Sequence, residues 1–149
     1  MRIALYQPEI AGNVGAILRL GACFGIAVDL IEPLGFAYSD RALARAGMDY
    51  ARAADVTRHA DWATFEQQAA ARIVLLTTRG DTRLDMAQFL ADDILLLGSE
   101  SSGVPADVAA SAALRVRIPL KAGLRSLNIA VSAGIVAAEA LRQTEGFPK

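Results

Sequence analysis

The chain has 149 residues, of which 54% are hydrophobic, so residues 1–149 are expected to form one compact domain. The formal net charge is −1. No apolar run approaches the ~18 residues of a membrane span, and the first residues lack the pattern of a signal peptide, which predicts a cytoplasmic protein. One cysteine and one histidine exclude an intrachain disulfide and an ordinary Cys/His zinc site, so no metal is expected.

The first third of the chain has a β-α-β pattern. Residues 2–6 (RIALY) form a short apolar strand, followed by a turn that Pro8, Gly12 and Gly15 punctuate. Asn13 is expected to cap a helix that runs to about Phe24 and stops at Gly25. Cys23 falls in the apolar pattern of this helix and is expected in the core. Residues 27–31 (AVDLI) form the next strand.

The middle of the chain alternates shorter elements. Residues 32–35 form a turn, and residues 40–46 (DRALARA) predict an exposed helix with Arg41 and Arg45 on one face. A weak strand lies around Val56, and Asp61 caps a helix that reaches about Ala71. Residues 72–77 (RIVLLT) form a strand, residues 86–90 a helical turn, and residues 94–97 (ILLL) a buried strand.

The last third ends in a very apolar helix. Pro105 opens a helix over residues 106–113, and residues 114–118 (LRVRI) alternate as a half-buried strand does. After a loop, Ser126 is a plausible cap for a helix that reaches about Gln143 and is apolar nearly all round. Such a helix needs cover on every side, which predicts a homodimer.

The C-terminal third is locally basic although the whole chain is not. From residue 106 onward there are three acidic residues, namely Asp107, Glu139 and Glu145. The six basic residues there are Arg115, Arg117, Lys121, Arg125, Arg142 and Lys149. Such an excess is often only a solvated face, but it is also compatible with contact to phosphate.

Two glycine-bearing loops follow strands. In residues 8–19 (PEIAGNVGAILR), Gly12 and Gly15 give G-x-x-G, whereas the dinucleotide fingerprint needs G-x-G-x-x-G. Residues 98–103 (GSESSG) have Glu100 where a nucleophile elbow has serine, and they lack the ending of a P-loop. Glu100 is therefore either a general base or a carboxylate that complements the dipole of the following helix. Ser126 is either a helix cap or part of a binding loop.

These segments, in this order, resemble the SPOUT methyltransferases, and in particular the small tRNA 2'-O-methyltransferases that act on the wobble nucleotide. The resemblance covers nearly the whole chain. It rests on LYQPEIAGNVGAILRL, IEPLGF, RAGMDY, LLTTRG, LLLGSESSGVP and RIPLKAGLRSLNIAVSAGIVAAEALRQ.

The resemblance implies an α/β fold with a mostly parallel sheet, helices on both faces and a C-terminal deep trefoil knot. It also implies methyl transfer from S-adenosylmethionine to the ribose 2'-hydroxyl of the wobble cytidine or uridine in tRNA, by a homodimer that binds the anticodon stem-loop. The implied cofactor contacts are Leu76, Gly98, Ile118 and Ser126. The implied catalytic residues are Arg19, Glu100 and Asn128, and the implied RNA contacts are Arg41, Arg45, Lys121 and Arg125.

Because a guanidinium stays protonated in proteins, we expect Arg19 to stabilise a developing alkoxide rather than to remove a proton. The alternative function is an α/β nucleotide-binding or tRNA-binding module without methyl transfer. In the nucleotide-binding version, the Gly12 turn and Asp29 would hold the ligand.

Overall fold

In a computed structural model, which describes residues 1–39 and 53–149, the chain folds around a parallel sheet. The described strands form a seven-stranded sheet in the order β3-β2-β1-β6-β4-β7-β5, and every pairing is parallel. Their bounds are β1 Arg2–Tyr6, β2 Ala27–Ile31, β3 Val56–His59, β4 Ile73–Leu76, β5 Thr82–Arg83, β6 Ile94–Leu97 and β7 Leu114–Arg117. The prediction of a mostly parallel α/β sheet is confirmed.

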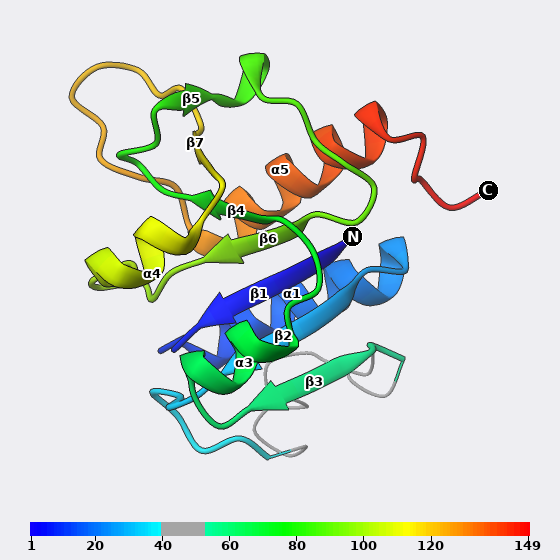
Figure 1. The fold of residues 1–149 in the computed structure, drawn as a ribbon, viewed down its shortest axis with the longest axis vertical. Helices are drawn as coiled ribbons and strands as arrows, with labels where there is room; N and C mark the ends of the chain where they lie inside the picture. The colour runs from blue at the N-terminus through cyan, green and yellow to red at the C-terminus, as the bar shows by residue number, and fades with distance from the viewer. Residues whose placement is uncertain (40–52) are drawn as a thin grey trace.

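Helices cover both faces of the sheet (Figure 1). On one face lie α1 (Ala11–Phe24) and α5 (Ile129–Gln143), which pack against each other and share one apolar cluster with the strands. The other face carries the short helices α3 (Trp62–Gln68) and α4 (Ala106–Ser111) over a second cluster. Because parallel strands are buried on both faces, their sequences are continuous apolar runs, as in the ILLL of β6.

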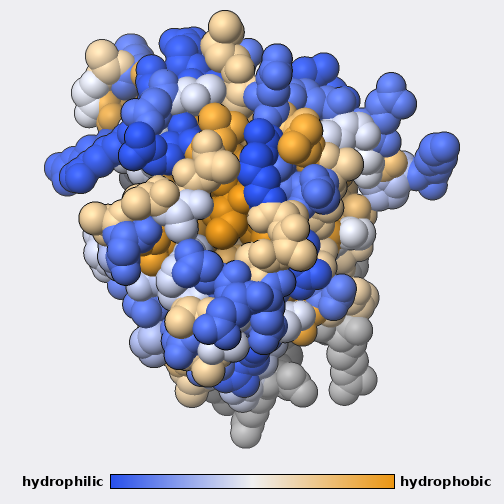
Figure 2. Space-filling model, viewed as in Figure 1, coloured by the Kyte–Doolittle hydropathy of each residue, from blue (hydrophilic) through white to orange (hydrophobic). Residues whose placement is uncertain are grey.

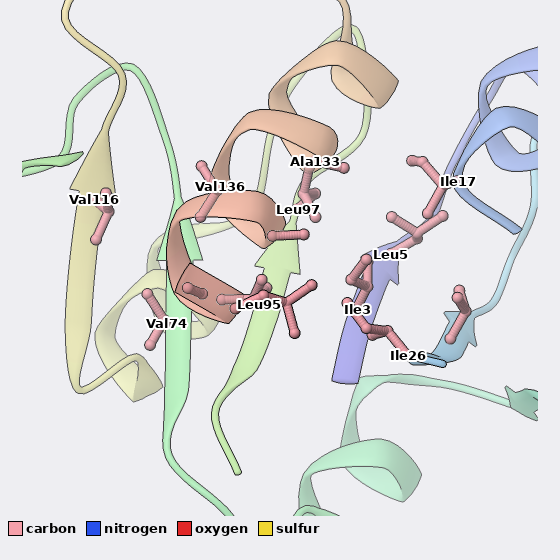
Figure 3. Close-up of a cluster of buried hydrophobic side chains, with 14 of the residues drawn as sticks. Ile3, Leu5, Ile17, Ile26, Val74, Leu95, Leu97, Val116, Ala133 and Val136 are labelled. Carbon is pink, nitrogen blue, oxygen red and sulfur yellow. The ribbon is translucent and has the colours of Figure 1, made fainter. Parts of the chain in front are cut away.

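The larger core lies between the sheet and the helix pair α1 and α5 (Figure 3). Leu95 and Leu97 of β6 point to this side, and Ala133 and Val136 of α5 meet them. All four side chains are at most 3% exposed. The small residues that thin α5 therefore serve close packing of this helix onto the sheet.

Strand β7 lies between two strands that are joined by a short link. It pairs with β4 on one side and β5 on the other, and residues 77–81 connect β4 to β5. At Gly80 in this link, a Cβ atom would lie only 2.5 Å from the carbonyl carbon of Val116. The link therefore crosses directly against the β7 backbone, and only glycine fits there.

A buried polar cluster joins the first three strands. Asp29 on β2 is 2% exposed and accepts hydrogen bonds from Arg2 Nε at 2.7 Å and Arg2 Nη2 at 2.9 Å. The His59 Nε2 atom on β3 lies 2.8 Å from the same carboxylate. Because a buried carboxylate is stable only when paired, this cluster fixes the register of β1, β2 and β3.

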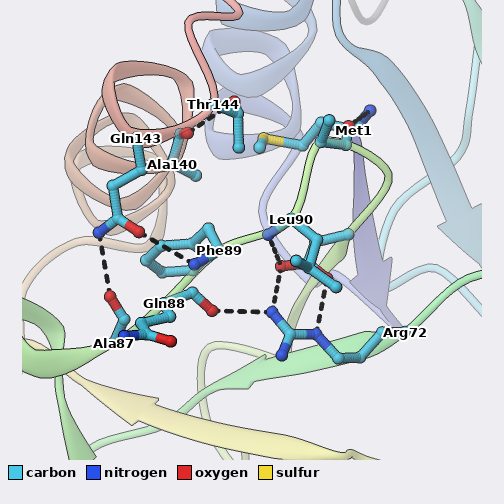
Figure 4. Close-up of polar contacts among 11 residues, drawn as sticks. Met1, Arg72, Ala87, Gln88, Phe89, Leu90, Ala140, Gln143 and Thr144 are labelled. Carbon is cyan, nitrogen blue, oxygen red and sulfur yellow. Dashed lines mark hydrogen bonds and ion pairs between the residues drawn. The ribbon is translucent and has the colours of Figure 1, made fainter.

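The segment before β6 is fastened between α5 and β4 (Figure 4). Gln143 of α5 donates to the Ala87 carbonyl at 3.0 Å and accepts from the Phe89 amide at 3.0 Å. Arg72 forms a two-bond contact with the buried Asp93 carboxylate at 2.8 and 2.7 Å. These contacts hold a segment without helix or strand in one conformation.

Several predicted element ends are confirmed. Gly25 ends α1 in the left-handed conformation, with φ 67°, and its amide donates to the Gly21 carbonyl. Asp61 caps α3 by accepting from the Thr64 amide at 2.7 Å, and this bond lowers the pKa of the Asp61 carboxyl. That helix ends at Gln68, three residues before the predicted Ala71.

Other expectations were wrong. The helical turn predicted at 86–90 is a 3-10 turn at Leu84–Met86, and the two-residue strand β5 was not predicted because so short a strand has no pattern. Cys23 is exposed rather than in the core. The buried face of α1 comprises Val14, Gly15, Ile17, Leu18 and Gly21, and position 23 falls off this face. The predicted helix at 40–46 lies outside the described residues.

On the face of the molecule seen in Figure 2, apolar surface gathers near the centre and hydrophilic side chains surround it. No helix of the described residues is long and apolar enough to cross a membrane. Within residues 1–39 and 53–149, no group of three or more His, Cys, Asp or Glu side chains is arranged to hold a metal ion.

Candidate active site

A large pocket lies where β4, β6 and β7 end. Its cavity volume is about 810 Å³, within the range of small-molecule sites. Three chain segments form most of its walls, namely residues 75–79, residues 97–104, and residues 118, 120 and 125–129. Because the carboxyl ends of parallel strands meet at one edge of a sheet, segments far apart in sequence converge here. Ile10 and Asn13, at the start of α1, also line the pocket, as do Ala106, Ala109, Arg115, Val116 and Ser132.

The loop after β6 closes on itself at the pocket wall. Ser99 and Gly103 exchange two backbone hydrogen bonds of 2.9 and 3.0 Å. A Cβ at Gly98 would lie 2.4 Å from the carbonyl carbon of Gly103, so glycine is required for this closure. Gly103 itself has a φ of 69°, which also favours glycine. The glycines therefore shape a narrow loop that lines the pocket.

Glu100 in this loop is held by the turn between β1 and α1. Its Oε2 accepts from the Glu9 amide at 2.8 Å, and its Oε1 accepts from Asn13 Nδ2 at 3.0 Å. The alternative that Glu100 complements a helix dipole is not supported by these contacts, because α4 begins only at Ala106. Glu100 is an oriented carboxylate in the pocket wall.

Asn128 links the third segment to the same network. Its Nδ2 donates to Asn13 Oδ1 at 2.9 Å, and its Oδ1 accepts from the Ala130 and Val131 amides at 2.8 and 3.3 Å. A continuous chain of side-chain hydrogen bonds therefore runs from Glu100 through Asn13 to Asn128, along one side of the pocket.

Both predicted helix caps in this region were wrong. Helix α1 begins at Ala11 after Ile10, so Asn13 lies inside its first turn and its side chain is free to bond Glu100 and Asn128. Helix α5 is capped by Asn128 and not by Ser126. An asparagine side chain has both an acceptor and a donor, so Asn128 caps the helix and contacts Asn13 at the same time.

The structure brings most of the predicted site residues together. Leu76, Gly98, Ile118 and Ser126, predicted as cofactor contacts, all line the pocket, as do Glu100, Asn128 and Arg125. Lys121 is exposed in the loop between β7 and α5, outside the lining. Arg41 and Arg45 lie outside the described residues.

Arg19 stands apart from this group. It is exposed on α1, six residues after Asn13, and is not among the residues that line the pocket of its own chain. It does make a contact within the molecule.

Three residues for which the sequence predicted no role in the site lie in the pocket wall or contact it. Asn13 joins Glu100 to Asn128, Glu9 contacts Glu100 through its amide, and Arg79 lines the pocket after β4. Arg79 lies in the LLTTRG motif shortly after the end of β4, and this position could have predicted that it lies at the pocket. Nothing local in the sequence distinguishes Asn13 from an ordinary helix cap.

A parallel α/β sheet with a pocket at the carboxyl ends of its strands defines a protein class that binds a small organic ligand at that edge. The model of the family described as SpoU rRNA methylase matches residues 1–138. The chain belongs to this family.

Curated relatives match over almost their full lengths. A protein from Beijerinckia indica subsp. indica, named tRNA (cytidine(34)-2'-O)-methyltransferase, is 47% identical over 150 residues, which cover 99% of this chain and 94% of the relative. A protein of the same name from Escherichia coli is 40% identical over 151 residues, covering 99% of this chain and 96% of the relative.

Solved structures share the fold. One, described as giving structural insights into the 2-OH methylation of C/U34 on tRNA, has a TM-score of 0.90 and 41% identity, over 95% of this chain and 94% of that one. An AdoMet-bound rRNA methyltransferase from Sinorhizobium meliloti has a TM-score of 0.84 and 29% identity, over 95% of this chain and 55% of that one.

Proposed function

We propose that this protein transfers a methyl group from S-adenosylmethionine to the ribose 2'-hydroxyl of the wobble nucleotide of tRNA, a cytidine or a uridine. One observation carries the proposal: three segments that are far apart in the sequence converge on one pocket, in a chain that is 47% identical to a tRNA (cytidine(34)-2'-O)-methyltransferase over 99% of its residues. We further propose that residues 1–149 act as one domain, in the cytoplasm.

The pocket fits the cofactor in size and chemistry. A volume of about 810 Å³ accommodates a nucleoside-sized group. The walls combine apolar side chains, such as Leu76 and Ile118, with the tight backbone loop at Gly98. Such walls suit an adenine ring and the polar groups of a ribose. When bound, S-adenosylmethionine supplies an electrophilic methyl group on a sulfonium.

In this proposal, Leu76, Gly98, Ile118 and Ser126 bind the cofactor. Glu100 and Asn128 orient the polar groups of the reacting ribose, because the hydrogen-bond chain through Asn13 fixes both side chains at the pocket. Holding the reacting groups in line contributes several kcal/mol of barrier reduction.

Arg19 is proposed to stabilise the developing 2'-alkoxide and the adjacent phosphate, since its guanidinium stays protonated. Arg19→Lys should then retain part of the rate of methyl transfer. Unchanged activity in Arg19→Ala would show that Arg19 takes no part in the reaction.

A homodimer is part of the proposal. On α5, the outward-facing Val131 and Ile135 are 50% and 38% exposed, and a second copy would cover them. Arg19 is exposed on α1, which packs beside α5, so the same contact would bring Arg19 to the pocket of the other subunit. Mixing Arg19→Ala subunits with Glu100→Gln subunits, each of low activity alone, should then raise activity well above that of either homodimer. No increase in a verified mixed dimer would show that each chain uses its own Arg19.

We propose that the tRNA anticodon stem-loop is bound by Arg41, Arg45, Lys121 and Arg125. Neither Lys121 nor Arg125 forms an ion pair with the part of the chain that the structure describes, which leaves both cations available for phosphate. Replacing Arg125 with Ala should weaken the salt dependence of tRNA binding, so that the negative slope of log affinity against log salt becomes shallower by about 1. Arg83→Gln, which removes an exposed arginine paired with Asp85, is the control.

The proposed fold includes a deep trefoil knot. Its support is the position of β7 between β4 and β5, because the chain that continues from β7 must pass the 77–81 link that crosses this strand. Knots are rare exceptions to the usual rules of chain connection.

The decisive experiment is incubation of the protein with unmodified tRNA and labelled S-adenosylmethionine, followed by mapping of the methylated nucleotide. The expected product carries one 2'-O-methyl group at the wobble cytidine or uridine. Binding of tRNA and S-adenosylhomocysteine without methyl transfer would favour the tRNA-binding alternative. Binding of NAD alone would favour the nucleotide-binding module.

A further inference from the structure

Two loops at the edge of the pocket hold each other through a reciprocal pair of contacts. The Glu9 amide donates to Glu100 Oε2 at 2.8 Å. In the opposite direction, the Glu9 carboxylate accepts from the Ser101 amide at 3.0 Å and from Ser101 Oγ at 2.5 Å. Glu9 follows β1 and Ser101 follows β6, so the contacts join the ends of two neighbouring strands.

Neutral donors, not cations, orient both carboxylates. Among the described residues, neither Glu9 nor Glu100 forms an ion pair. The two hydrogen bonds of Glu100 are partly buried and so are less weakened by water than those of a free surface carboxylate, whereas the two between Ser101 and Glu9 are exposed. Their direction is therefore set by a small number of N–H and O–H groups.

The backbone of Glu9 is also fixed from its other side. The Gly35 amide donates to the Pro8 carbonyl at 3.0 Å. A Cβ at Gly35 would lie 2.7 Å from Glu9 Cα, so the turn after β2 packs directly against this residue. Gln7, two residues before Glu9, has a φ of 46°, which is uncommon for a residue other than glycine. The amide that Glu9 presents to Glu100 is thus held in one position.

We propose that Glu9 is a positioning residue for the methyl-transfer reaction. Its carboxylate fastens Ser101, and its amide fixes the Glu100 carboxylate at the pocket. Glu100 in turn orients Asn13, which orients Asn128. Glu9 itself does not line the pocket, so it acts on the reaction through Glu100, whose neighbour Ser101 its carboxylate holds in place. The inference rests on the proposed function, because the positioned groups are those assigned to the ribose.

The test compares Glu9→Ala with Glu9→Gln, and uses Glu66→Ala as a control on the exposed side of α3. Glu9→Ala keeps the backbone amide but removes both hydrogen bonds to Ser101, the neighbour of Glu100, and should lower kcat about tenfold while leaving KM for tRNA and Kd for S-adenosylhomocysteine within about twofold. Glu9→Gln should recover most of kcat, because its amide group still accepts from the Ser101 N–H and donates to Ser101 Oγ. Glu66→Ala should match the wild type.

A double variant separates positioning from a general loss of structure. If Glu9 acts only through Glu100, then Glu9→Ala should lower kcat by less than about twofold in a Glu100→Gln background. Independent losses in the two variants would overturn the proposal, and so would full kcat in Glu9→Ala.

A second readout does not depend on activity. Hydrogen exchange at the amide of residue 9, followed by NMR, should accelerate about tenfold in Glu9→Ala while the β6 amides keep their protection. Unchanged exchange at residue 9 would overturn the positioning role, and loss of β6 protection would show unfolding instead. If the wild type transfers no methyl group to tRNA, the proposed function fails, and the exchange measurement still decides whether Glu9 orders Glu100.

Discussion

The two functions of the Asn128 side chain can be separated by substitution. Its Oδ1 caps α5 through the Ala130 and Val131 amides, and its Nδ2 donates to Asn13 Oδ1. Asn128→Asp keeps an oxygen for the cap and loses the donor to Asn13. Asn128→Ala loses both contacts. The difference between the two variants therefore measures the cap together with the interaction of the new carboxylate with the helix N-terminus.

The expected magnitudes follow from these contacts. Loss of an N-cap side chain costs about 1 kcal/mol, and loss of the partly exposed hydrogen bond to Asn13 costs roughly 0.5 to 1 kcal/mol. Asn128→Ala should thus lower the free energy of unfolding by about 1.5 to 2 kcal/mol, which is about 3 to 8 °C in Tm for a chain of this size. Asn128→Asp should lose less than about 1 kcal/mol, because a carboxylate at a helix N-terminus is also favourable.

Urea unfolding of the ligand-free protein, at one fixed protein concentration, measures these differences. Ser126→Ala is the control for stability, because Ser126 does not cap the helix and its loss should leave the unfolding midpoint unchanged. Equal destabilisation by Asn128→Asp and Asn128→Ala would refute the cap, and an unchanged Asn128→Ala would refute both contacts. Both Asn128 variants should lose methyl transfer, and wild-type rates in Asn128→Asp would remove the contact with Asn13 from the reaction.

Three further outcomes test the fold. Asp29→Asn should lower the free energy of unfolding in urea by about 1 to 3 kcal/mol, because it removes the charge of a buried carboxylate that pairs with the partly exposed Arg2 and contacts His59, and an unchanged midpoint would contradict that role. Gly80→Ala should lower the free energy of unfolding by about 1 to 3 kcal/mol, since the new methyl group would lie 2.5 Å from a β7 backbone carbon. Gly12→Ala, where no atom lies within 4 Å, should leave the free energy of unfolding unchanged. Equal effects of the two substitutions would argue against the close contact between the 77–81 link and β7. The Arg142 guanidinium lowers the pKa of Glu139 to about 2. The contribution of this ion pair to stability is therefore fully present above the usual glutamate pKa and is lost as pH falls toward 2. If NMR showed Glu139 titrating in the ordinary glutamate range, this contribution would be refuted.

The sequence by itself determined the elements whose signals are local. Apolar runs such as residues 2–6 and 94–97 are strands in the structure because a parallel sheet buries both of their faces. Gly25 and Asp61 marked helix ends because a left-handed φ and a side-chain acceptor act within a few residues. The loops after these strands indicated the ligand edge, since parallel strands end on the same side.

Local signals alone did not decide which of two polar residues caps a helix. Ser126 and Asn128 both suit an N-cap, and Asn128 takes the position in a structure where it also bonds Asn13 of another helix. Asn13 had the residue type of a cap, but Ile10 stands at that position and Asn13 turns toward Glu100.

Only the tertiary structure decided how the site is assembled. The pairing of β7 with both β4 and β5 joins strands that are distant in sequence, and the Glu100–Asn13–Asn128 chain spans 115 positions between its last two members. Sequence patterns report the periodicity of single elements, whereas these contacts depend on which elements become neighbours. The sequence therefore placed most of the predicted site residues near one edge of the sheet, and packing determined which of them bond to one another.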